Sequence, residues 1–60
     1  MTAFQAKLER FETLASECDS IADRAADGAK REAYLRLGAR YRELAGDMRS
    51  VIATIETAAA

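Results

Sequence analysis

Apolar residues recur at alternating spacings of four and three along two segments of this 60-residue sequence, and this periodicity limits the fold more than any other feature. The first segment carries Phe4, Leu8, Phe11, Ala15, Cys18, Ala22 and Ala25. The second carries Tyr34, Leu37, Tyr41, Leu44, Met48, Val51, Ile55 and Ala58. Such spacing places the apolar side chains on one side of an α-helix, as in a coiled coil. The sequence therefore predicts an all-α fold with two amphipathic helices.

Local signals mark where these helices begin and end. Thr2 and Gln5 fit a capping box, in which each side chain binds the backbone N–H of the other residue. The first apolar stripe stops just before Asp27 and Gly28. Gly28 suits a turn with positive φ, and Asp27 can cap the helix that follows. These signals predict a tight turn between the two helices.

The predicted organisation is a single helical hairpin. We expect one domain over residues 1–60, with a helix at about 3–26, a turn at 26–28 and a helix at about 29–57. So short a turn forces the two helices to lie antiparallel. The second helix has a weak point at Gly46, where a glycine costs about 1 kcal/mol relative to alanine. From Val51 onward, the second helix is expected to extend beyond the first.

The charges favour the same pairing. Residues 1–23 contain two basic and five acidic residues, whereas residues 24–49 contain seven basic and four acidic residues. An acidic helix that folds against a basic one gains opposite charges along the edges of contact. Each exposed pair contributes only about 0.2–1 kcal/mol, so these charges set the orientation more than the stability.

Two helices alone cannot cover these apolar stripes, which Leu14, Ile21 and Ile52 widen further. A small scaffold usually needs disulfides, a metal or a partner, and the composition excludes the first two. We expect a homodimer in which two hairpins form a four-helix bundle, and another protein as the alternative partner. The residues expected in the core or the interface are Phe4, Leu8, Phe11, Leu14, Cys18, Ile21, Tyr34, Leu37, Tyr41, Leu44, Met48, Val51, Ile52 and Ile55.

From Arg31 to Ala45 the sequence reads R-E-A-Y-L-R-L-G-A-R-Y-R-E-L-A. This segment, with the end of the first helix from Ile21, resembles a group of very short bacterial helical-hairpin proteins of unknown function. Gly38 stands where that group usually has alanine. The resemblance covers about half of the chain and implies a helical hairpin without implying an activity. Residues 34–41 are also similar to part of one tetratricopeptide-repeat helix.

The composition argues against an enzyme. The chain has no histidine and one cysteine, Cys18, which removes the usual zinc sites and the Ser-His and Cys-His pairs of nucleophilic catalysis. Cys18 is expected to be a small buried apolar residue. We therefore expect no catalytic residue, no metal site and no cofactor. A charged N-terminal segment and the lack of a long apolar run predict a cytoplasmic protein without a membrane span.

Arg31, Arg42 and Arg49 share one side of the second helix, with Leu35 beside them. Because Leu35 lies outside the apolar stripe, these four residues are a candidate patch for a partner. Hairpin dimers of the Rop type bind RNA with a similar architecture, but a pI of about 5.3 is unfavourable for nucleic acid. The first hypothesis is a non-enzymatic protein-interaction module or small adaptor. The alternatives are a small nucleic-acid-binding regulator and a small subunit of a larger assembly.

Overall fold

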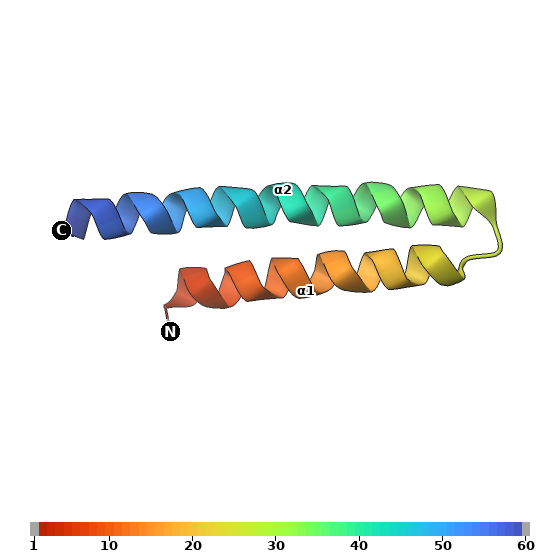
Figure 1. The fold of residues 1–60 in the computed structure, drawn as a ribbon, viewed down its shortest axis with the longest axis horizontal. Helices are drawn as coiled ribbons and strands as arrows, with labels where there is room; N and C mark the ends of the chain where they lie inside the picture. Colours follow the sequence, from red (N-terminus) through yellow and green to blue (C-terminus); the bar gives the residue numbers. More distant parts are fainter. Residues whose placement is uncertain (1, 60) are drawn as a thin grey trace.

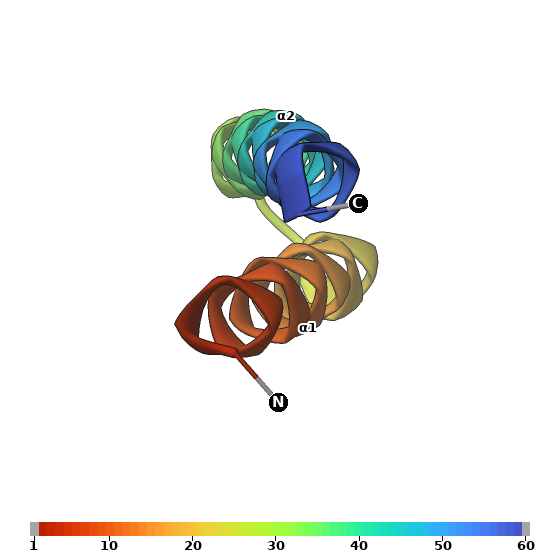
Figure 2. The same ribbon diagram turned by 90° about the vertical axis from the view of Figure 1, so that its left-hand side faces the viewer.

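The computed structural model describes residues 2–59, which form two α-helices joined by a short connection (Figure 1). α1 spans Ala3–Arg24 and α2 spans Gly28–Ala59. The helices run antiparallel in one layer, with extents of 50 × 17 × 11 Å (Figure 2). The prediction of an all-α hairpin is confirmed. Met1 and Ala60, the two ends of the predicted domain, lie outside the described residues.

The N-terminus of α1 is held by the predicted capping box. The backbone N–H of Gln5 donates to Oγ1 of Thr2 at 3.1 Å, and the N–H of Thr2 donates to Oε1 of Gln5 at 2.9 Å. These bonds satisfy two backbone donors that the first turn of a helix otherwise leaves unpaired. Such a cap typically contributes about 1 kcal/mol to stability.

The connection between the helices begins at Ala25, because α1 ends at Arg24, two residues before its expected end. Ala25 is extended, with φ −73° and ψ 124°, while its side chain is buried against α2. The guanidinium of Arg31 donates from Nη2 to the carbonyl oxygen of Ala25 at 3.0 Å. α1 stops at Arg24 because the backbone of Ala25 is no longer helical, and the Arg31 bond supplies a partner for the carbonyl oxygen of Ala25.

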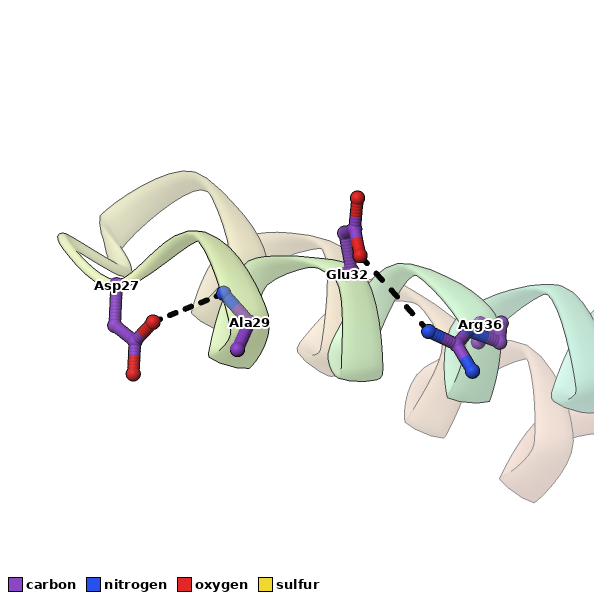
Figure 3. Close-up of polar contacts among 4 residues, drawn as sticks. All are labelled: Asp27, Ala29, Glu32 and Arg36. Carbon is purple, nitrogen blue, oxygen red and sulfur yellow. Dashed lines mark hydrogen bonds and ion pairs between the residues drawn. The ribbon is translucent and has the colours of Figure 1, made fainter.

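Asp27 caps α2 as predicted, but the expected positive φ at Gly28 is wrong. Oδ1 of Asp27 accepts a hydrogen bond from the backbone N–H of Ala29 at 2.9 Å (Figure 3). No glycine among the described residues has a positive φ, and Gly28 is the first residue of α2. The chain reverses through extended Ala25 and the Asp27 cap, so the turn does not use the left-handed region.

α2 runs without a break through Gly46 and continues two residues past its expected end. The end of α2 extends beyond the N-terminus of α1 (Figure 1). Side chains on a helix lean toward its N-terminus, so Ile52 and Ile55 lean back over α1. Both line a hollow together with Phe4. The backbone of α2 therefore extends beyond α1, but the side chains of Ile52 and Ile55 still lie next to Phe4 of α1.

The centre of the hairpin is built from small residues. The buried side chains are Ala15, Cys18, Ala22, Ala25 and Ala45, and Gly38 is buried with them. A Cβ on Gly38 would lie 3.3 Å from Cβ of Cys18 and 3.2 Å from Oδ1 of Asp19. The helices therefore approach closely where these small residues meet, and larger side chains are left at the flanks. Of the residues expected in the core or interface, only Cys18 is buried within the hairpin.

The two glycines inside α2 should respond differently to alanine. Gly46 has no neighbouring atom within 4 Å of a new Cβ, so Gly46→Ala should raise the free energy of unfolding by about 0.5–1 kcal/mol through helix propensity. Gly38→Ala gains the same propensity but presses on Cys18 and Asp19. Urea denaturation should therefore rank Gly46→Ala above Gly38→Ala. Equal stability of the two variants would show that the helices are not this close at Gly38.

Candidate protein-interaction surface

Ion pairs between the helices close one side of the hairpin. The Arg42 guanidinium binds Asp19, and Nη2 of Arg49 lies 3.0 Å from Oε2 of Glu12. The two acids are seven residues apart on α1, and the two arginines are seven apart on α2. Seven residues are two helical turns, so both pairs form on the same side. We call this side the ion-pair face. All four side chains are partly exposed, and each pair contributes no more than about 1 kcal/mol.

The predicted arginine stripe lies on the ion-pair face and is engaged within the hairpin. Arg42 and Arg49 bind carboxylates of α1, and Arg31 binds the carbonyl oxygen of Ala25. A phosphate group would therefore have to compete with oxygen atoms of the chain itself for each of these guanidinium groups. The stripe's observed role is to hold α2 and the connection against α1.

The opposite side of the hairpin is apolar. An α-helix turns by about 100° per residue, which places Leu14 and Ile21 on the far side of the α1 contact line from Glu12 and Asp19. The same geometry separates the apolar flank of α2 from Arg42. Because the ion pairs align one side of α1 with one side of α2, the two apolar flanks also face the same way. We call this surface the apolar face, and its residues are Leu14, Ile21, Leu37, Leu44, Met48, Val51 and Ile55.

The apolar face is incompletely covered by the hairpin. Leu37 is 41% exposed, and Val51 and Ile55 are also exposed. The other four members are half-buried. Among the described residues, no large side chain is fully buried. The packing of two helices therefore leaves large aliphatic side chains of this face in contact with water.

The remaining predicted core residues lie along the join between the helices or at its open end. The rings of Phe11 and Tyr41 stack with centroids 6.3 Å apart and an interplanar angle of 25°. This contact connects α1 to α2 beside the buried alanines. Leu8, Tyr34 and Ile52 are half-buried, and Phe4 is exposed. These side chains lie between the buried small residues and the solvent.

Leu35 lies apart from the apolar face. It is 50% exposed, and its helical position places it on the outer edge of the ion-pair face, beside Arg31 and Arg42. One exposed leucine among charged residues is ordinary for a protein surface. The candidate patch of Leu35 and the three arginines is therefore small, whereas the apolar face contains seven large apolar residues.

The described part of the chain offers no other obvious site. Within residues 2–59, no three Cys, Asp or Glu side chains gather closely enough to hold a metal ion. No helix in this range combines the length and apolar character that crossing a bilayer requires. Comparisons with protein-family models, with curated proteins and with solved structures found no match to this chain.

Proposed function

We propose that this chain is a non-enzymatic protein-interaction module that acts as a homodimer. Two hairpins pack through their apolar faces and form a four-helix bundle. The observation that carries this proposal is the exposure of the apolar face, where large side chains such as Leu37 remain in water. Such a surface is typical of a protein-binding site when it is continuous.

The surface area of the hairpin supports association. The chain exposes 4473 Å², whereas a compact monomer of 6.6 kDa exposes about 3,900 Å². The excess of about 600 Å² arises because two helices in one layer have no second layer to pack against. A specific dimer buries at least about 1,000 Å² in total, and the apolar faces of two copies can supply this area.

Sedimentation equilibrium tests the proposal directly. The parent chain should sediment at twice its 6.6 kDa mass at tens of micromolar and dissociate on dilution. Leu37→Glu should weaken the dimer at least about tenfold, because a carboxylate would have to leave water at the interface. A parent chain that stays monomeric at tens of micromolar would contradict the homodimer.

Leu35→Glu is the matched control. It introduces the same charge two residues away, at a leucine that is also exposed but lies on the ion-pair face. The Leu35 variant should dimerise like the parent. Loss of dimer in both variants would show that the effect does not depend on which face carries the charge, and would contradict the apolar face as the specific interface. Loss in the Leu35 variant alone would make the arginine patch the interface.

A further inference from the structure

We propose that the two hairpins of this dimer are related by a two-fold axis parallel to their long direction, so that α1 of each copy packs on α2 of the second copy. This inference rests on the proposed homodimer and specifies its contacts. In this arrangement Leu14 meets Leu44 of the second copy, and Ile21 meets Leu37. Charged residues at the rims of the same faces form the pairs Arg10 with Asp47 and Glu17 with Arg40.

The argument begins with the heights of residues along the hairpin. Gly38 lies beside Cys18 and Asp19, which fixes how α2 is aligned with α1. Equal steps of 1.5 Å per residue in opposite directions then give the other heights. Leu14 falls within about 3 Å of the height of Leu44, and Ile21 within about 3 Å of Leu37. The two large side chains of the α1 flank therefore occur at the heights of Leu44 and Leu37 on α2.

Charged residues at the rims of the apolar face also occur at matching heights on α1 and α2. Arg10 lies near the height of Asp47, and Glu17 lies near the height of Arg40. All four residues are exposed, and their helical positions place them at the outer edges of the apolar face. In the part of the chain that the structure describes, the ion pairs of the hairpin use none of Arg10, Glu17 and Asp47, whereas Arg40 lies 3.6 Å from Glu43 of its own helix, with both side chains exposed. Opposite charges thus stand at equal heights on the two helices.

A two-fold axis along the hairpin leaves every height unchanged while it exchanges the positions of α1 and α2. It therefore brings each residue of α1 opposite the residue of α2 at the same height in the second copy. Leu14 then packs on Leu44 of the second copy, and Ile21 packs on Leu37. At the rims, an arginine faces a carboxylate in each of four pairs, because each of the two pairs occurs twice in the dimer. A partner of unrelated sequence would have no reason to match these heights, so charge complementarity identifies the occupant as a second copy of this chain.

A pair of charge-reversed variants tests this arrangement. One variant carries Arg10→Glu with Glu17→Arg on α1, and the other carries Arg40→Glu with Asp47→Arg on α2. In a homodimer of either variant, all four rim pairs become like charges. Each variant alone should dimerise at least about tenfold more weakly than the parent, since exposed pairs contribute up to about 1 kcal/mol each. A mixture of the two restores all four opposite pairs and should form a heterodimer.

The measurement is sedimentation of each variant and of the mixture, with a polyhistidine tag on one variant to recover the mixed dimer. Circular dichroism checks that each variant keeps the helicity of the parent. The matched control is Glu32→Arg with Arg36→Glu, which exchanges the charges of an exposed ion pair on the outer side of α2. This control should dimerise like the parent.

The outcomes separate the arrangement from the dimer itself. A parent that never dimerises overturns both proposals. If the parent dimerises and each reversed variant dimerises equally well alone, the arrangement is wrong. Reversing both charges of one helix would keep opposite charges together only if α1 packed on α1, or α2 on α2, of the second copy. If neither the variants nor their mixture dimerise, the charges do not pair as proposed and the arrangement also falls. Preferential heterodimer formation supports it.

Discussion

Replacing Ala22 with leucine is expected to destabilise the hairpin by about 1–3 kcal/mol, enough to unfold much of so small a domain. Ala22 is 1% exposed and lies among the small residues that set the distance between α1 and α2. Three additional heavy atoms cannot be placed there unless the helices separate. Separation would also lengthen the Asp19–Arg42 contact. Thermal melting monitored by circular dichroism should show a lower midpoint and a broader transition.

Ala6→Leu is the control for this variant. Ala6 is an exposed residue of the same helix, so its replacement changes composition and helix propensity in the same way without touching the contact between the helices. This variant should melt within about 0.5 kcal/mol of the parent. If Ala22→Leu is as stable as Ala6→Leu, the close approach of the helices at Ala22 is wrong.

The sequence was sufficient to predict the direction of each helix and its caps. Periodicity reports which side of a helix faces a neighbour, and the Thr2–Gln5 and Asp27 signals act within a few residues of themselves. Short connections then allow only an antiparallel pair. These features depend on local geometry, which the order of residues determines almost completely.

The depth of burial could not be obtained in the same way. A heptad pattern treats Phe11 and Ala15 as equivalent, but the distance between two helices is set where their smallest residues meet. The backbones approach closely at Gly38 and Ala22, and Leu37, about 100° around the helix from Gly38, lies at the flank. Predicting this requires the alignment of α1 with α2, which depends on packing between residues far apart in the chain.

The ion pairs between the helices could be predicted only in part from the sequence. The charge imbalance predicted that the helices would attract each other but named no partners. A usable signal was present in the equal spacing of Glu12 with Asp19 and of Arg42 with Arg49. Two acids and two bases separated by the same two turns can pair only in one alignment of antiparallel helices. That alignment also fixes which side of the hairpin remains apolar.

Deleting residues 51–60 is expected to lower the melting midpoint by more than about 10 °C and to weaken dimerisation. The deletion removes Val51, Ile52 and Ile55, and full burial of each such side chain is worth about 1.5–3 kcal/mol. Of these three side chains, only Ile52 is half-buried within one hairpin. Most of the expected loss of stability therefore arises from the burial of Val51 and Ile55 by a second copy. A loss of about 3 kcal/mol corresponds to at least about 12 °C in a domain of this size.

Deletion of residues 57–60 provides the comparison, because it shortens α2 but keeps Ile52 and Ile55 against Phe4. The shorter deletion should melt close to the parent. In both the parent and the shorter deletion, the midpoint should rise with protein concentration, since association of the proposed dimer stabilises the folded hairpin by mass action. In the longer deletion this dependence should weaken together with the midpoint. Equal midpoints for the two deletions would show that the C-terminal part of the apolar face contributes neither to the hairpin nor to the dimer.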